Sequence, residues 1–106
     1  MTLHPAIKVV IITEKILLKN ICTMIEARGA SGYTVVAAGG KGSRNQRSTA
    51  DRASVVEDFS NVKIEIIVNA RDLAETIMNQ VAEEYFIHYS GIAYLEEVSI
   101  LRPRKF

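Results

Sequence analysis

The sequence predicts an α+β sandwich, with two helices covering one face of a four-stranded antiparallel sheet. Four short segments are rich in apolar and β-branched residues, as expected of strands. Two segments with apolar residues at helical spacing separate the first strand from the second and the third from the fourth. The order β-α-β-β-α-β gives a ferredoxin-like sandwich, and 106 residues are enough for one domain, residues 1–106.

The first half of the chain predicts a strand, a helix and a second strand. Residues 6–12 form the first strand, and Thr13 is expected to cap the following helix, with Glu14 in its first turn. Gly29 is a natural helix stop, and "YTVVAA", residues 33–38, reads as the second strand. The apolar face of this helix consists of Leu17, Ile21, Met24 and Ile25.

The second half repeats the pattern. "NVKIEIIVN", residues 61–69, alternates with the period of two that is typical of a strand. Asn69 and Asp72 resemble a capping box for the second helix. After the turn "HYSG", residues 92–101 form the last strand. The core positions of the second helix are Leu73, Ile77, Val81 and Tyr85.

Charge, cysteine content and hydrophobicity exclude several classes of function. The net charge of +1 argues against nucleic-acid binding by bulk electrostatics. Cys22 is the single cysteine, which excludes an internal disulfide and a multi-cysteine zinc site, and we expect no metal site. The longest apolar run, residues 9–12, is far short of the ~20 residues that a membrane span needs. We therefore expect a soluble, cytoplasmic protein.

Two predicted strands, residues 6–12 and 33–38, are apolar on both faces. The helices of this fold cover one face of the sheet, so the other face should be polar in a monomer. An exposed apolar sheet face is usually buried against another subunit. We therefore expect a homo-oligomer.

A polar stretch from Gly39 to Ser60 separates the second and third strands. Its glycines let backbone N–H groups approach an anion, and Arg44 and Arg47, three positions apart, can converge on one phosphate. It does not match the GxxxxGK[ST] phosphate-binding loop, because Lys41 is followed by Gly42. On these residues alone, a phosphate site and a plain solvated loop both remain open.

The motifs "TEKILLK" and "GYTV…GGKGSRNQRS", together with "NVKIEIIV" and "YFIHYSGIAYLEEVSIL", resemble the PII-like carbon-sensing regulators of the SbtB type. The resemblance covers nearly the whole chain. It implies a homotrimer that binds the adenine nucleotides cAMP, AMP, ADP and ATP in clefts between subunits. It also implies regulation of a sodium-dependent bicarbonate transporter, in a carbon-concentrating mechanism, by docking on its cytoplasmic face.

Carried over position by position, the resemblance implies a nucleotide site. The phosphate-binding positions at the base of the loop are Gly40, Lys41, Gly42, Ser43, Arg44 and Arg47. Gly91, in "YSGIAY", matches a turn whose backbone approaches the nucleotide from the adjoining subunit. Thr34 and Val35 are candidates for ribose or base contacts. A divalent metal is expected only with ATP, held mainly by the phosphates.

The resemblance also implies a partner-binding segment. The family's T-loop corresponds to residues 40–60, and 46–58 is the mobile, partner-facing part. Through it the protein would associate peripherally with the membrane, at its transporter. The candidate partner-binding residues are Gln46, Ser48, Thr49, Asp51, Arg52 and Glu57.

The expected role is regulatory rather than enzymatic. Some relatives carry a cysteine-bearing C-terminal extension linked to redox control and slow nucleotide hydrolysis, whereas this chain ends in "LRPRKF". Two other functions remain compatible with the sequence. One is an enzyme that slowly hydrolyses ATP or ADP, and the other is an RNA-binding module on the same fold.

Overall fold

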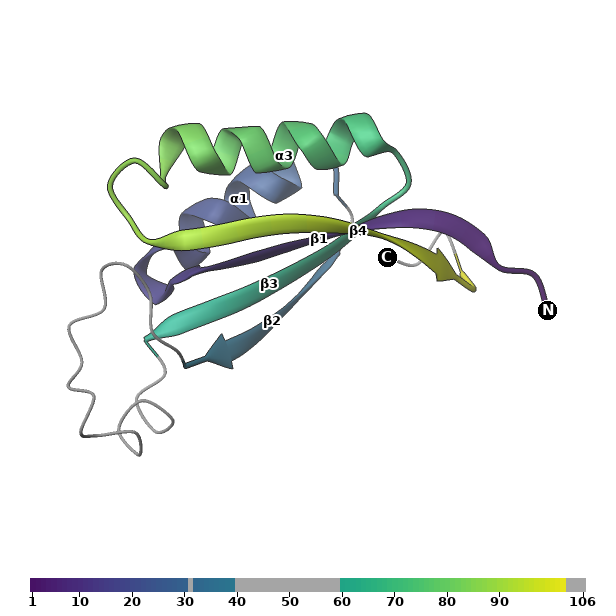
Figure 1. The fold of residues 1–106 in the computed structure, drawn as a ribbon, viewed down its shortest axis with the longest axis horizontal. Coiled ribbons are helices and arrows are strands. Elements are labelled where there is room, and N and C mark those ends of the chain that lie inside the picture. The colour runs from purple at the N-terminus through teal and green to yellow at the C-terminus, as the bar shows by residue number, and fades with distance from the viewer. Residues whose placement is uncertain (31, 40–59, 103–106) are drawn as a thin grey trace.

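The computed structural model describes residues 1–30, 32–39 and 60–102. Its four strands form one antiparallel sheet in the order β2-β3-β1-β4, and both helices lie on one face of it (Figure 1). The elements are β1 (His4–Glu14), α1 (Leu18–Ala27), β2 (Tyr33–Ala38), β3 (Asn61–Val68), α3 (Arg71–Glu84) and β4 (Gly91–Ile100). This arrangement confirms the predicted ferredoxin-like sandwich.

β1 is a central strand and is longer than predicted, extending over His4–Glu14 instead of residues 6–12. It pairs with β3 on one side and with β4 on the other, from His4 opposite Ile100 to Thr13 opposite Gly91. Pairing explains the added residues, because β4 supplies ladder partners at the start of the strand and β3 supplies Asn61 as the partner of Glu14.

Thr13 does not cap a helix, so the predicted cap is wrong. Thr13 belongs to β1, where it continues the inward-facing series of Ile7, Val9 and Ile11 and is 2% exposed. Its hydroxyl donates to a carbonyl in the turn before β4, 2.8 Å away. The helical segment begins instead with a short 3-10 turn, Lys15–Leu17, whose N-terminus has no side-chain cap.

The end of α1 follows the prediction. Gly29 adopts a φ of +91°, a left-handed conformation that favours glycine. Its N–H donates to the carbonyl of Glu26 at 3.0 Å, and the N–H of Ala30 donates to that of Ile25 at 3.3 Å. These two bonds form a Schellman motif, which satisfies the last carbonyls of the helix.

The core lies between the helices and the sheet. The predicted apolar face of α1 and its 3-10 turn is buried as expected, as are Ile77 and Val81 of α3. Leu73 and Tyr85 pack at the edge of the core and are only partly buried. The sheet contributes alternate residues of its central strands, namely Ile7, Val9, Ile11, Val62, Ile64, Ile66 and Val68.

The boundaries of α3 and β4 differ slightly from the prediction. The Asn69–Asp72 capping box does not form, because β3 ends at Val68 and the N-cap of α3 is Ala70, without a side-chain cap. Asp72 still lies in the first turn, where a negative charge interacts favourably with the helix dipole. β4 begins and ends one residue earlier than predicted, at Gly91 and Ile100.

The sheet face without helices is amphipathic rather than uniformly apolar. One row across the strands contains Val36, Lys63, Ile12 and Ile92, and the next contains Thr34, Glu65, Val10 and Tyr94. The charged residues pair with each other, Lys8 with Glu96 and Lys63 with Glu65, each at 3.2 Å. Large apolar side chains nevertheless remain exposed on this face, since Val36 is 49% and Ile92 57% exposed.

Candidate functional site

The candidate site lies at one end of the sheet, where β1 and β2 end and β3 and β4 begin (Figure 1). The ladder places Glu14 and Ala38 on either side of Asn61, and Thr13 opposite Gly91. Residues 39 and 60, which flank the predicted loop, therefore lie at the same end of the sheet as the turn between α3 and β4, although residue 39 follows the opposite edge strand. The two ends of the predicted loop and this turn therefore belong to one end of the sheet, as a phosphate-binding loop with a nearby backbone turn would require.

Consecutive residues at the end of β1 hold this turn. Thr13 Oγ1 donates to the carbonyl of Ser90 at 2.8 Å. The carboxylate of Glu14 accepts from the N–H of Ser90 at 2.7 Å and from its hydroxyl at 3.3 Å. The N–H of Lys15 donates to the carbonyl of Ser60 at 2.9 Å, joining the same segment to the residue before β3. We call Thr13 and Glu14 with their bonds to Ser90 the Ser90 bracket.

Gly91 follows the bracket and is exposed, but the space where a side chain would begin is already occupied. A Cβ atom at this position would lie 2.5 Å from Cε1 of Phe86 and 2.9 Å from the carbonyl oxygen of Ile12. Such distances are far below van der Waals contact, so packing alone demands glycine here. Packing is therefore a second reason for glycine at position 91, in addition to the predicted contact with a nucleotide.

The other two described candidates, Thr34 and Val35, point away from each other. They are neighbours on β2, so their side chains lie on opposite faces of the sheet. Thr34 lies in the same row as Val10 and Tyr94 on the face without helices, whereas Val35 lines a groove beside α1. A ligand that lies on one face of the sheet would therefore contact the side chain of only one of them.

Thr34 and Gly91 also lie on opposite edges of the sheet, because β2 and β4 are its two edge strands. Within one chain they do not come together. The remaining site candidates lie outside the described residues, as do the basic Arg104 and Lys105. These candidates are Gly40, Lys41, Gly42, Ser43, Arg44, Arg47, Gln46, Ser48, Thr49, Asp51, Arg52 and Glu57.

A groove between α1 and edge strand β2 contains a polar cluster. The Tyr33 hydroxyl donates to the carboxylate of Glu26 at 2.6 Å, and this bond is the main reason why the pKa of Tyr33 is raised. Cys22 lies beside them, and partial burial raises the pKa of its thiol. A raised pKa keeps the thiol protonated and unreactive. This agrees with a packing role for Cys22.

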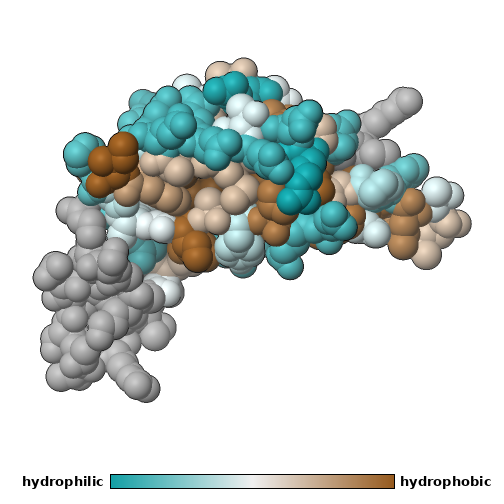
Figure 2. Space-filling view, turned by 45° about the horizontal axis from the view of Figure 1, so that its top comes forward, coloured by the Kyte–Doolittle hydropathy of each residue, from teal (hydrophilic) through white to brown (hydrophobic). Residues whose placement is uncertain are grey.

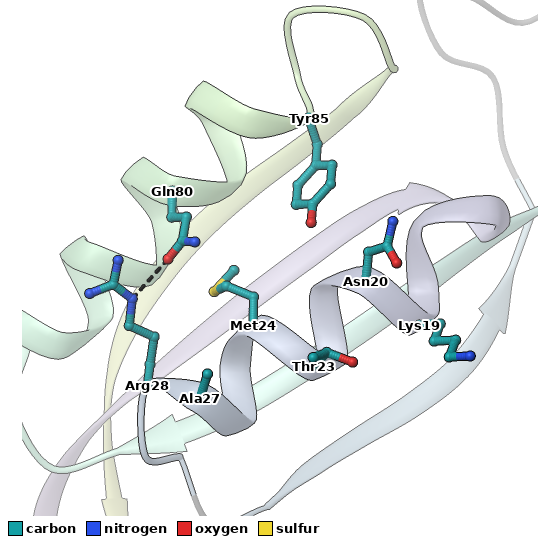
Figure 3. A pocket seen from close by; sticks show the side chains of 8 residues that line it. All are labelled: Lys19, Asn20, Thr23, Met24, Ala27, Arg28, Gln80 and Tyr85. Carbon is teal, nitrogen blue, oxygen red and sulfur yellow. Dashed lines mark hydrogen bonds between the residues drawn. The ribbon is translucent and has the colours of Figure 1, made fainter.

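A second groove separates α1 from α3 on the outer side of the molecule (Figure 3). Met24 lies between the helices, and the side chains of Asn20 and Tyr85 come from either side. Arg28 Nε donates to Gln80 Oε1 at 2.8 Å and so closes one end of the groove. None of the sequence-predicted site residues lines it.

The outer surface of the helices is mainly hydrophilic, with apolar side chains interrupting it below α3 (Figure 2). Within residues 1–30, 32–39 and 60–102, no helix combines the length and hydrophobicity of a membrane span. In the same part of the chain, no three His, Cys, Asp or Glu residues gather as a metal-binding group.

Comparison with known proteins assigns the family. Residues 6–105 match the model of the family described as nitrogen regulatory protein P-II. The chain belongs to the P-II family. A PII-like signalling protein from Thermus thermophilus, described as putative, is 37% identical to this P-II chain, with a TM-score of 0.78. That match covers 100% of this chain and 99% of the other.

Two further structures are of CPII, a PII-like protein from Thiomonas intermedia. The one bound to ADP, AMP and acetate is 25% identical, has a TM-score of 0.78, and covers 100% of this chain and 98% of its own. The one bound to ADP and bicarbonate is 24% identical, has a TM-score of 0.80, and covers 99% and 97%. At 24% identity, the structure with ADP and bicarbonate supports only the fold of this P-II chain.

Sequence reasoning missed the Ser90 bracket. Thr13 and Glu14 follow an apolar run, and the polar pair was interpreted as the start of a helix. The signal that could have corrected this is the period of two, since Thr13 falls in phase with Val9 and Ile11. The partner in the turn, Ser90, is 76 residues away from Glu14, and no local pattern indicates a contact at that distance.

Proposed function

We propose that this P-II protein is a signalling protein that binds adenine nucleotides in clefts between the subunits of a homotrimer. The observation that carries the proposal is the placement of Thr34 and Gly91 on opposite edges of the sheet. A site that uses both must be built from two chains, in which β2 of one subunit approaches the turn before β4 of the next. The complex of CPII with ADP and AMP supports the ligand class.

In the proposed site, the phosphates are held by the base of the loop. Gly40 and Gly42 allow close approach of the backbone, Lys41 and Ser43 add donors, and Arg44 and Arg47 supply the charge. Hydrogen bonds to charged groups contribute roughly 1.5 to 3 kcal/mol each. Two or three of them are consistent with micromolar affinity.

The two candidates for ribose or base contacts, Thr34 and Val35, lie on opposite faces of the sheet. Thr34 presents its hydroxyl on the face without helices, which is the face available to another subunit. Val35 is on the helix side and is assigned to contacts with the groove beside α1. We therefore favour Thr34 as the polar contact, with Gly91 contributed by the adjoining subunit.

The signal would pass to a partner through the segment at 46–58. A nucleotide changes a conformational equilibrium only by binding one state better than another. AMP, cAMP, ADP and ATP would therefore act by favouring different states of this segment, with a divalent metal accompanying ATP only. The proposed partner is a sodium-dependent bicarbonate transporter at the cytoplasmic face of the membrane, and the role is regulatory rather than catalytic.

Calorimetry on single variants tests the nucleotide site. Arg44→Ala and Arg47→Ala should each weaken ADP binding by about tenfold, the loss of one charge-assisted contact. Arg52→Ala is the matched control, because it removes the same charge from a position assigned to the partner. Equal affinity in all three variants and the wild type would refute the assignment of the arginines.

The partner requires a separate experiment. The tagged protein is incubated with detergent-solubilised membranes containing the transporter, with each nucleotide added in turn. Retention of the transporter should depend on which nucleotide is present. Retention that is the same with every nucleotide, or absent with all of them, would contradict the proposed regulation.

A further inference from the structure

The Ser90 bracket holds both backbone groups of one residue with two consecutive side chains. Thr13 Oγ1 donates to the carbonyl of Ser90 at 2.8 Å, and Glu14 accepts from its N–H at 2.7 Å. Thr13 is the buried polar residue of the described core, with 2% of its surface exposed. A buried hydroxyl and a carbonyl that satisfy each other fix the local geometry, because breaking the bond leaves both groups unpaired.

The carbonyl of Ser90 and the N–H of Gly91 belong to the same peptide unit. That unit is planar and trans, so fixing the direction of the carbonyl also fixes the direction of the N–H. At Gly91, Phe86 and the carbonyl of Ile12 leave no room for a Cβ atom, so the neighbouring chain packs closely beside this peptide unit. The turn therefore presents the Ser90–Gly91 backbone in one orientation before any ligand arrives.

We propose that Thr13 and Glu14 are positioning residues of the nucleotide site, and that they hold the Ser90–Gly91 peptide in the orientation that the nucleotide contacts. The inference rests on the proposed function and extends it to two residues to which no role in binding has been given. Preorganised backbone groups increase affinity because ordering them costs nothing at the moment of binding.

The charge of Glu14 provides a way to separate positioning from electrostatics. Removal of the carboxylate also changes the electrostatic potential at a nearby nucleotide phosphate, so two variants that both lack the charge are compared with each other. Glu14→Gln and Glu14→Ala remove the same charge, but only the glutamine retains an oxygen that can accept from the N–H of Ser90. The difference between the two variants therefore measures positioning without a change in charge.

The test is calorimetric titration of ADP into the full chain and its variants. We expect Glu14→Ala to bind ADP about fivefold more weakly than Glu14→Gln, the effect of one hydrogen bond. Thr13→Val should lower the affinity for ADP by a similar factor, whereas Thr13→Ser keeps the hydroxyl and should bind ADP like the wild type. Glu75→Ala, an equal loss of charge on α3, is the control and should leave affinity unchanged.

Amide hydrogen exchange without nucleotide gives a second measurement. Glu14→Ala should accelerate exchange at Ser90, while the amides of β3 remain protected as in the wild type. If Glu14→Ala and Glu14→Gln bind ADP equally, the positioning role is wrong, although nucleotide binding by the wild type would stand. If the wild type binds no adenine nucleotide, the proposed function fails and this inference fails with it.

Discussion

The hydroxyl of Tyr33, the first residue of β2, donates a 2.6 Å hydrogen bond to the carboxylate of Glu26 on α1. The bond connects edge strand β2 to the helix that lies over it. It also raises the pKa of Tyr33 above its ordinary value near 10, because ionised tyrosine cannot donate the bond.

This relationship predicts a specific pH dependence. The raised pKa means that the folded chain keeps the phenol proton at pH values where the unfolded chain has lost it. The bond therefore stabilises the fold fully below pH ~10, and its contribution is lost as the pH rises further. In urea unfolding between pH 8 and 11, the wild type should lose more stability than Tyr33→Phe. Glu26→Ala should behave like Tyr33→Phe, and identical profiles for all three would contradict the role of the bond.

Gly91→Ala should destabilise the fold by about 1 to 3 kcal/mol, since its Cβ would overlap the ring of Phe86 and the carbonyl of Ile12. Thermal or urea unfolding measures this loss. In a Phe86→Leu background the additional loss should be smaller, because the smaller side chain makes room for the methyl group. A Gly91→Ala protein as stable as the wild type would show that the turn can relax.

Lys15→Pro tests the bond between the end of β1 and Ser60. Proline removes the N–H that donates to the carbonyl of Ser60 at 2.9 Å. It otherwise suits the position, because Lys15 opens the 3-10 turn and Glu14 before it is extended, with φ −68° and ψ 138°. We expect a loss of about 1 kcal/mol in unfolding free energy. Lys15→Ala keeps the N–H and should be neutral, so equal losses in both variants would assign the effect to the side chain instead.

The face of the sheet without helices should be the subunit interface. Ile92→Glu places a charge on a side chain that is 57% exposed and lies in the row of Val36 and Ile12. Sedimentation should show a wild-type species well above the 11.8 kDa of one chain and a variant shifted towards that mass. Ala82→Glu, on the exposed side of α3, should sediment like the wild type. A monomeric wild type would contradict the proposed trimer.

The sequence was sufficient for the elements whose pattern is set locally. β2 has the predicted bounds, Tyr33–Ala38, and the buried side of α1 contains Ile21, Met24 and Ile25 as expected. Helical periodicity indicates α1 because one of its faces is buried. β2 is indicated instead by its apolar, β-branched composition, since none of its residues is buried. The left-handed Gly29 was also predictable, since the conformation needs glycine.

The errors arose where distant contacts decide the structure. Thr13 and Asn69 are polar residues next to apolar runs, which fits a helix cap and a strand end equally well. Thr13 stays in β1 because it pairs with Gly91 in the sheet and its hydroxyl donates a hydrogen bond to the carbonyl of Ser90. Both partners are more than seventy residues away in the sequence. The sequence also cannot say why position 91 is glycine, because close packing and contact with a ligand would both require glycine there.

Nucleotide binding by the wild-type chain can be measured by calorimetric titration with ADP, with GDP as the control. We expect saturable binding of ADP at about one nucleotide per chain, with micromolar affinity, and weaker binding of GDP. Absence of binding at millimolar ADP, or equal affinity for ADP and GDP, would contradict an adenine-nucleotide sensor.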